Sequence, residues 1–202
     1  NDLRIEKLIL NMYGNHQADN ACLAFAVSKE AMKLKGREDI DVESLRRAYR
    51  EVTWVGRFEI IGRDPLMILD GGINRECAKH IKETLIEMGS LDNLFIIGVP
   101  DDKDYIGTIL ELKEVASSII LTKARNKSLH FNINQYEKVK EVIGEENLYS
   151  TSCIEEAMSL AVKLNEDNKT LCIVGTQSLV ADTKRLMNPE YMLIKETESV
   201  AL

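Results

Sequence analysis

The sequence lacks a long apolar run, since none approaches the roughly 18 uninterrupted apolar residues of a transmembrane helix. It also lacks an excess of basic residues, because its net charge is −7 and its pI is about 5.2. We therefore expect neither a membrane nor a nucleic acid among its partners. The N-terminal stretch has neither the basic nor the apolar segment of a signal peptide, so we expect a cytoplasmic location.

Clustered metal-binding residues are also lacking. The three histidines do not supply the spacing of a zinc site, and no two cysteines form a CxxC pair. We predict no metal site in this chain, and free thiols that are buried in a reducing cytosol. The cysteines are Cys22, Cys77, Cys153 and Cys172.

What the sequence does have is a globular composition. It contains 202 residues, of which 45% are hydrophobic, so wholesale disorder and collagen-like repeats are excluded. This length corresponds to one large domain or two small ones. The chain begins without Met, and we expect it to be a fragment of a longer protein.

The periodicity of the apolar residues changes near Gly56, and the segment before it predicts one short strand and two helices. We expect the strand over residues 5–10 and the first helix between the turn at Gly14 and a stop at Gly36. Asp41 is placed to cap the second helix, whose apolar residues share one face. This helical hairpin buries little surface alone, so we expect it to pack against a larger body.

After Gly56, short apolar runs alternate with helical stretches. The alternation predicts an α/β fold with a mostly parallel, Rossmann-like sheet, right-handed crossovers and helices on both faces. The expected strands are residues 57–62, 66–69, 94–99, 118–121 and 171–174, and the expected helices are residues 74–88, 103–115, 133–143, 154–164 and 177–187. From Asn188 onward there is no clear period, and we expect a loosely held tail.

Ligands of such sheets meet the carboxyl ends of the strands, where we expect four polar segments. In residues 66–74, a strand is followed by Asp70, two glycines and Asn74. Glycine permits close backbone approach, and the N–H groups of the next helix can face an anion. Asp70 can accept hydrogen bonds from a ribose or bind an ammonium group. An ordinary tight turn between strand and helix explains the same spacing equally well.

The other three segments carry signals that also have plain structural explanations. Residues 98–104 place acidic side chains where they can cap a helix, and they add Lys103 as a cation for a phosphate or carboxylate. Residues 175–178 offer a hydroxyl and backbone amides to a carboxylate, although Thr176 as a helix cap explains them as well. Residues 54–59 contain Arg57 beside a glycine, which suits either a hinge that delivers a charge or a plain linker.

Taken in order, five segments resemble the folylpolyglutamate and dihydrofolate synthases. Gly14-Asn-His-Gln-Ala-Asp-Asn20-Ala is similar to the G-x-HQ-x-x-N-A segment that ends their central domain, and Trp54-Val-Gly-Arg-Phe-Glu59 is similar to their W-P-G-R-F-E linker. The remaining matches are Leu69-Asp-Gly-Gly-Ile-Asn74 to L-D-G-A-H-N, Asp102-Lys-Asp104 to D-K-D, and Gly175-Thr176 to the glycine–hydroxyl pair after the last strand. The order of the segments, over nearly the whole chain, makes the match specific.

The resemblance implies how the chain is divided and which chemistry it serves. Residues 1–53 would end the central ATPase domain, residues 54–56 would be a hinge linker, and residues 57–202 would form the C-terminal glutamate-ligase-type α/β domain that the Mur ligases share. The full-length enzyme would use ATP and Mg²⁺. A carboxylate of a folate-type substrate would take the γ-phosphate, and the amino group of L-glutamate would attack the acyl phosphate.

The resemblance also implies ligand roles for individual residues. On the ATP side, Asn20, with His16 and Gln17, would lie at the adenine, Arg57 would reach a phosphate, and Asp70 would reach the ribose. On the glutamate side, the candidates are Asn74, Arg75, Lys103, Asp104 and Thr176.

The sequence departs from the family pattern at several points. Ile73 replaces the histidine of D-G-A-H-N, and isoleucine can neither hydrogen-bond a carboxylate nor carry a proton, which leaves the identity of the added amino acid open. Arg75 replaces the next proline and offers a cation, and Val55 replaces the linker proline. There is no G-x-x-x-x-G-K-[ST], so we expect the P-loop and the magnesium ligands outside this chain.

Two functions of different classes follow from the sequence. One is the C-terminal part of a ligase, inactive alone, whose partners are the missing ATPase domain, ATP, a folate-type substrate and L-glutamate, with a dimer through the exposed hairpin as a further expectation. The other is a solitary, non-catalytic domain that binds a ligand or a protein. A P-loop in frame upstream of Asn1 would favour the ligase, and a start codon just before Asn1 would favour the binding domain.

Overall fold

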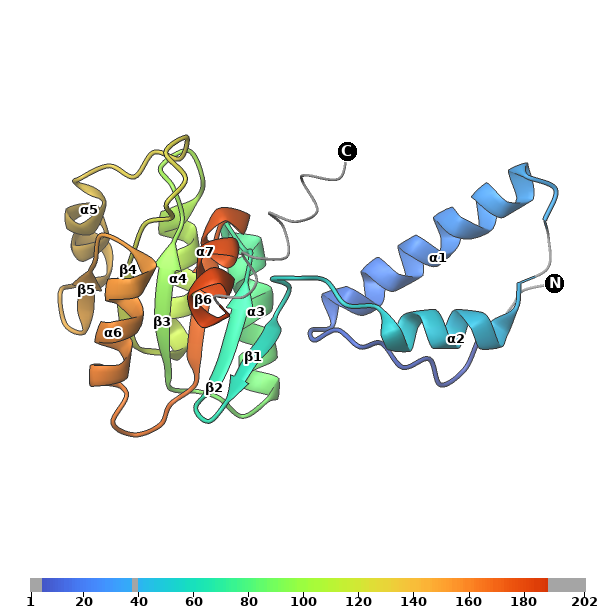
Figure 1. The fold of residues 1–202 in the computed structure, drawn as a ribbon, viewed down its shortest axis with the longest axis horizontal. Helices are drawn as coiled ribbons and strands as arrows, with labels where there is room; N and C mark the ends of the chain where they lie inside the picture. Colours follow the sequence, from blue (N-terminus) through green and yellow to red (C-terminus); the bar gives the residue numbers. More distant parts are fainter. Residues whose placement is uncertain (1–4, 38–39, 189–202) are drawn as a thin grey trace.

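The structure is a computed structural model that describes residues 5–37 and 40–188. Two helices, α1 (His16–Leu34) and α2 (Val42–Glu51), project from an α/β body that holds the other elements (Figure 1). The tail predicted from Asn188 onward lies outside the described residues, apart from Asn188 itself. In the described part, no helix is both long enough and apolar enough to cross a membrane.

The body is built on a six-stranded sheet with the strand order β1-β2-β6-β3-β4-β5. Its strands are β1 (Glu59–Arg63), β2 (Leu66–Asp70), β3 (Asn93–Gly98), β4 (Ala116–Leu121), β5 (Leu148–Ser150) and β6 (Leu171–Gly175). β1 pairs with β2 in the antiparallel sense and every other neighbouring pair is parallel, which confirms the expected mostly parallel sheet. Because β6 lies between β2 and β3, the segments that follow these three strands meet at one edge.

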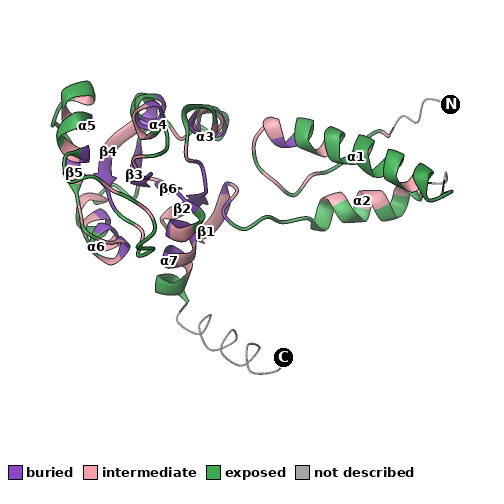
Figure 2. Cartoon of the chain, turned by 90° about the horizontal axis from the view of Figure 1, so that it is seen from above, coloured by how far each residue is buried: buried purple, intermediate pink, exposed green. Residues whose placement is uncertain are grey.

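Helices cover both faces of this sheet, as the sequence predicts. They are α3 (Arg75–Glu87), α4 (Tyr105–Leu112), α5 (Gln135–Ile143), α6 (Ile154–Leu164) and α7 (Gln177–Met187), with a short 3₁₀ helix over Lys113–Val115. Along β3, Phe95 belongs to the buried cluster under α3, α4 and α5, whereas Ile96 belongs to the cluster under α6 and α7. Figure 2 shows the strands as the most buried elements, and α1 and α2 as mostly exposed.

Side-chain caps explain where four of the helices begin. Asp41 accepts a hydrogen bond from the Glu43 backbone amide at the start of α2, as its position in the sequence predicts. Asn74, Asp104 and Thr176 do the same for α3, α4 and α7. The last three of these caps fix the starts of α3, α4 and α7 at the sheet edge where ligands are expected.

Two expectations about strands need correction. Residues 5–10 form no strand, because no neighbouring strand in the described part of the chain completes their hydrogen bonds; instead the amide of Asn11 bonds to the carbonyl of Tyr49 at 3.2 Å. β5 was not predicted, because three residues are too short for a periodic signal, and it forms along the free edge of β4.

The prediction of buried thiols also needs correction. All four cysteines are free, but only Cys172 is buried, while Cys22 is exposed and Cys77 and Cys153 are half-buried. Cys22 lies on α1, where Gln17 is the one buried residue of the helix, so an apolar neighbourhood in the sequence did not mean burial.

Candidate functional site

A cavity of about 480 Å³ lies where the helical hairpin meets the body, a size typical of small-molecule sites. The structure brings together around it all the residues predicted on the ATP side. His16, Gln17 and Asn20 come from the first turns of α1, Arg57 precedes β1, and Asp70 ends β2. The structure shows that these residues line one cavity, and their binding of ATP stays a prediction.

The rest of the wall includes residues that were not predicted as ligand contacts. Cys77, His80 and Ile81 face the cavity from α3. Trp54 and Phe58 face it from the linker region, which is the segment 52–58 between α2 and β1. Cys77, His80 and Ile81 are spaced as one face of a helix, so periodicity could have placed them together. Their position opposite α1 depends on how the hairpin docks, which no local signal specifies.

Asp70 anchors the linker region to the sheet. Its carboxylate is buried and accepts two hydrogen bonds of 2.7 Å, from the backbone amides of Phe58 and Gly72. Burial raises the pKa of Asp70, and this outweighs the opposing effects of the amide of Phe58, the charge of Arg57 and the amide of Gly72. Phe58 has a φ of +44°, a backbone conformation that is uncommon for a bulky residue, and the bond to Asp70 helps to hold it there.

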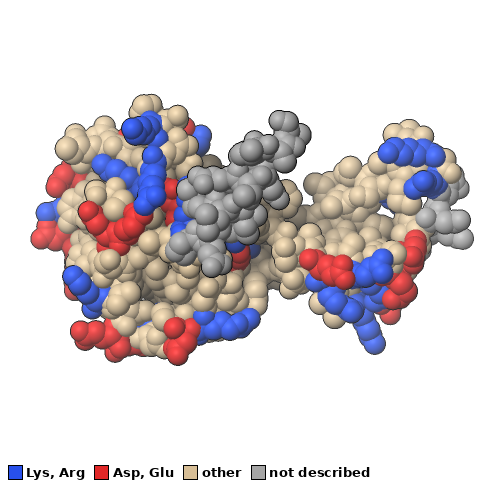
Figure 3. Space-filling model, viewed as in Figure 1, with Lys and Arg blue, Asp and Glu red and all other residues tan. Residues whose placement is uncertain are grey.

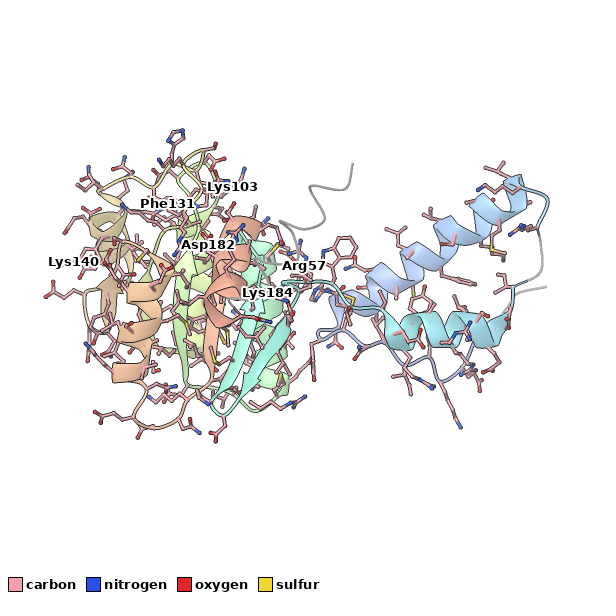
Figure 4. All side chains as sticks on the ribbon, viewed as in Figure 1. Arg57, Lys103, Phe131, Lys140, Asp182 and Lys184 are labelled. Atoms are coloured by element: carbon pink, nitrogen blue, oxygen red, sulfur yellow. The ribbon has the colours of Figure 1, made fainter. Side chains whose placement is uncertain are left out.

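Arg57 presents a half-buried guanidinium at the same place (Figure 4). Its Nη1 donates to the Gly56 carbonyl at 3.4 Å, and in the described part of the chain it forms no ion pair. The carboxylate of Glu59 is engaged elsewhere, by Lys184 at 2.5 Å and by the amide of Gly56 at 2.9 Å. The charge of Arg57 is therefore available to a ligand.

Gly71 permits two side chains to converge beside this guanidinium. A Cβ atom at Gly71 would lie 2.7 Å from Nη1 of Arg57 and 2.3 Å from Nε2 of Gln177, closer than non-bonded atoms approach. Gln177 begins α7 and is another residue that the sequence did not indicate as a candidate. Because Gly71 has no side chain, the side chains of Arg57 and Gln177 can both lie against its backbone at the end of β2.

The first turn of α1 contacts α3 directly. The rings of His16 and His80 stack with centroids 4.3 Å apart and an interplanar angle of 18°. Gly14 has a φ of +97°, and a Cβ atom there would lie 2.7 Å from the His16 ring and 2.9 Å from Oγ1 of Thr84. Glycine at this position therefore permits both the turn and the close approach of the hairpin to α3.

The candidates for the glutamate side do not line this cavity. Asn74 accepts from the amide of Cys77 and Thr176 from the amide of Leu179, so both act as helix caps. Asp104 accepts from the amide of Gly107 at 2.9 Å and from the amide of Arg75 at 3.4 Å. Lys103 pairs with Asp102 at 3.0 Å, in the loop after β3 and away from Arg57 (Figure 4).

The residues that replace the family's histidine and proline have structural contacts of their own. Ile73 is half-buried and packs against the core cluster under α3. Nε of Arg75 donates to Glu111 at 2.8 Å, and Lys82 binds the same carboxylate at 2.6 Å. Arg75 is thus a bridge between α3 and α4, and its guanidinium is already partnered on one edge.

The described residues show neither a cluster of metal ligands nor, on the face seen in Figure 3, a surface patch of one charge. Within residues 5–37 and 40–188, no group of three or more His, Cys, Asp or Glu side chains is placed to hold a metal ion. On the face seen in Figure 3, acidic and basic side chains of the described residues are interspersed over both the body and the hairpin.

Comparison with known proteins gives sequence relatives over a little more than half of the chain. A probable bifunctional folylpolyglutamate synthase/dihydropteroate synthase of Haloferax volcanii is 34% identical over 118 residues, which cover 58% of this chain and 13% of that protein. A dihydrofolate synthase/folylpolyglutamate synthase of Mycobacterium tuberculosis is 30% identical over 118 residues, which cover 57% of this chain and 24% of that protein. The alignments thus span only a small part of these relatives. No family model matches the chain.

Solved structures share the fold over nearly the whole chain. The folylpolyglutamate synthase of Mycobacterium tuberculosis, complexed with ADP and AMPPCP, is 22% identical with a TM-score of 0.81, covering 90% of this chain and 42% of that one. The folylpolyglutamate synthase of Thermotoga maritima is 21% identical with a TM-score of 0.68, covering 92% and 42%. The expected resemblance is therefore confirmed for sequence and fold: a part of this chain is similar in sequence to folylpolyglutamate and dihydrofolate synthases, and the chain has the α/β fold of a part of the solved folylpolyglutamate synthase structures.

Proposed function

We propose that this chain is the C-terminal part of an ATP-dependent ligase that adds L-glutamate to a carboxylate of a folate-type substrate. The observation that carries the proposal is the cavity of about 480 Å³, where motif residues from three separate segments converge. A structural neighbour complexed with ADP and AMPPCP supports ATP as the ligand.

The free hydrogen-bonding capacity around the cavity suits a nucleoside. Asn20 donates one N–H to Oε1 of Gln17 at 3.1 Å, which leaves the Asn20 oxygen and the Gln17 amide for the edge of an adenine. Each oxygen of Asp70 accepts one backbone N–H, and its remaining lone pairs can accept the ribose hydroxyls. Arg57 can hold two phosphate oxygens at once with its fork of N–H donors.

The reaction would proceed in two steps at the edge formed by β2, β6 and β3. A carboxylate oxygen of the folate-type substrate attacks the γ-phosphorus, ADP leaves, and an acyl phosphate forms. The neutral amine of L-glutamate then attacks the acyl carbon, phosphate leaves, and the nitrogen loses a proton. Arg57 stabilises the charge that develops on the transferred phosphoryl group.

Mg²⁺ and the glutamate side complete the proposal. Mg²⁺ would neutralise phosphate charge, and we propose that its ligands lie in a part of the parent that this chain does not include. Glutamate would approach from the ends of β3 and β6, where Lys103 and Thr176 retain donors beyond their present contacts. Asn74, Arg75 and Asp104 would contribute mainly by fixing the first turns of α3 and α4.

Nucleotide binding by this chain tests the cavity directly. Titration of ATP into the protein, followed through the fluorescence of Trp54 and by calorimetry, is expected to give weak binding that Asn20→Ala and Arg57→Ala each weaken by about tenfold. Lys140→Ala is a matched control on α5, on the far side of the body (Figure 4), and is expected to leave binding unchanged. Binding that is equally strong in all four proteins would contradict the proposed site.

Turnover is expected only with the rest of the parent. Phosphate release from ATP by this chain, with glutamate and a folate-type substrate present, is expected to equal the buffer control, because the phosphate-cradling loop is absent from the sequence. The longer gene product is expected to release phosphate only when glutamate is present. Glutamate-dependent phosphate release by this chain alone would contradict the proposal that catalysis requires a phosphate-binding loop from another part of the parent.

A further inference from the structure

His80 belongs to none of the motifs, yet it forms a ring contact between the hairpin and the body. Its imidazole stacks on that of His16 at 4.3 Å, and both rings line the cavity. A second ring contact joins Tyr13 to Phe58 with centroids 5.7 Å apart, and Nδ2 of Asn15 donates to Glu87 at 2.5 Å. The docking of α1 against α3 therefore rests on a small contact with two titratable rings at its centre.

The charges around the two rings are unequal. His80 has a carboxylate near each ring nitrogen, with Nε2 at 3.6 Å from Glu76 and Nδ1 at 3.5 Å from Glu83. The charged groups that act on His16 are His80 and Glu83 of α3, Arg57 of the linker region and Asp19 of α1.

Protonation of His16 therefore opposes docking. Burial lowers the pKa of His16, and the neighbouring His80 lowers it further, while Glu83 and Asp19 offset only a part of this. When the hairpin separates from α3, His16 regains water and the pKa returns toward the usual value of about 6.5. A group whose pKa is lower in the docked state stabilises that state at high pH, and this stabilisation is lost as the pH falls through about 6.5 and below.

We propose that His80 is a positioning residue, which holds the first turn of α1 against α3 by stacking on His16 and makes the docking of the hairpin dependent on pH. The link to catalysis rests on the proposed function, since docking sets one wall of the proposed ATP cavity. The docking equilibrium itself requires no nucleotide, so it is tested with this chain alone.

The composition makes the test specific. The chain has three histidines and one tryptophan, and Trp54 lies in the linker beside the cavity. His80→Phe keeps a ring that can stack but has no nitrogen that can take up a proton. His130→Gln is the matched control, because His130 is exposed in the loop between β4 and α5 and lies outside the cavity lining.

The experiment measures docking between pH 7.5 and 5.5 without nucleotide. The radius of gyration by small-angle X-ray scattering and the fluorescence of Trp54 report the separation, and imidazole NMR signals report the titration of His16. In the wild type, the ratio of undocked to docked protein is expected to rise several-fold as the pH falls. In His80→Phe this rise is expected to be smaller than in the wild type, because the effect of His80 is lost while the burial of His16 remains, and the pKa of His16 is expected to be higher than in the wild type. His130→Gln is expected to behave as the wild type.

Other results would overturn the proposal. A pH response of full size in His80→Phe, or no response in the wild type, would show that the ring pair does not control docking. Circular dichroism at both pH values confirms that each variant is folded, and His80→Tyr provides a second neutral ring if His80→Phe is not. Because no nucleotide is present, a failure here leaves the ATP-binding test unaffected, and a failure of ATP binding leaves this one unaffected.

Discussion

At the scale of single residues, Asp70 serves the fold as well as the proposed ribose contact. The two backbone amides that it binds belong to segments on either side of the β1–β2 hairpin, so one carboxylate fixes the linker region to the end of β2. A residue that was predicted to contact a ligand thus also makes structural hydrogen bonds.

Replacing Asp70 by asparagine tests the structural role. The amide side chain has one acceptor oxygen, and its NH₂ group would face a donor, so one buried N–H loses its partner. We expect Asp70→Asn to lower the free energy of unfolding by about 1–3 kcal/mol in a urea titration. The control Asp167→Asn changes an exposed carboxylate and is expected to alter stability by less than about 0.5 kcal/mol. Equal effects of the two would argue against the anchoring role.

Arg57, in contrast, is expected to matter for turnover and to contribute little to stability. It has no ion pair among the described residues, and Glu59 is engaged by Lys184, so removing the guanidinium costs the fold little. In the longer parent, Arg57→Ala is expected to lower turnover by about 10²-fold, the scale of losing one charge-stabilising donor. The melting temperature of this chain is expected to stay nearly unchanged. A stable parent variant with normal turnover would remove Arg57 from the site.

At the scale of the elements, two glycines at strand ends differ in what surrounds them. A Cβ atom at Gly175 would lie 2.3 Å from the backbone oxygen of Gly98 on the paired strand, which cannot move without parting β3 from β6. A Cβ atom at Gly71 would meet only the ends of the side chains of Arg57 and Gln177, which can rotate away.

These two positions provide a matched pair of substitutions. Gly175→Ala is expected to destabilise the protein by about 2–4 kcal/mol, in the range of overpacked cores with backbone shifts. Gly71→Ala is expected to cost less than about 1 kcal/mol, but to weaken ATP binding because it displaces Arg57. Chemical denaturation and an ATP titration of both variants provide the comparison, and a reversed order of stability would contradict it.

The contact between α3 and α4 is expected to depend on pH through Glu111. Hydrogen bonds from Lys82 and Arg75 lower the pKa of Glu111, so its contribution is present above the unfolded value of about 4.3 and is lost as the pH falls through the lower folded value. Glu111→Gln is expected to cost about 1 kcal/mol at pH 7, and the difference from wild type is expected to shrink below about pH 4. Glu114→Gln, which removes an exposed carboxylate that binds Lys82, is expected to have a smaller effect.

At the scale of the whole molecule, the hairpin and the body differ in how much they bury. Between them the helices α1 and α2 have Gln17 as their one buried residue, while the body contains two buried clusters. The division at residues 54–56 stays a prediction, and proteolysis is the direct test of it.

Limited proteolysis is expected to cut the linker first. Trp54 is 65% exposed and lies outside any helix or strand, so chymotrypsin can bind the backbone there without unfolding the sheet. Mass spectrometry of early digests is expected to show a stable product that begins near residues 55–57. Early cleavage within residues 94–121 would contradict this division, because β3 and β4 are central strands.

The sequence predicted correctly those features that depend on interactions between neighbouring residues. The runs of buried residues in β3 and β6 and the caps Asp41, Asn74 and Thr176 act within a few residues, so the strands and the helix starts could be predicted from them. The strand expected over residues 5–10 was wrong, because a strand needs a partner and local sequence does not provide one.

By itself, then, the sequence determined the α/β class, the positions of most elements and which motif residues to compare with the synthases. These follow from periodicity, capping and short motifs, which are properties of neighbouring residues. Only the tertiary structure decided that Asn20, Arg57 and Asp70 share one cavity, that Gln177 joins Arg57 over Gly71, and that His80 meets His16. Such contacts join residues far apart in the chain, and they arise only when the crossovers and the docked hairpin bring separate segments to the same edge of the sheet.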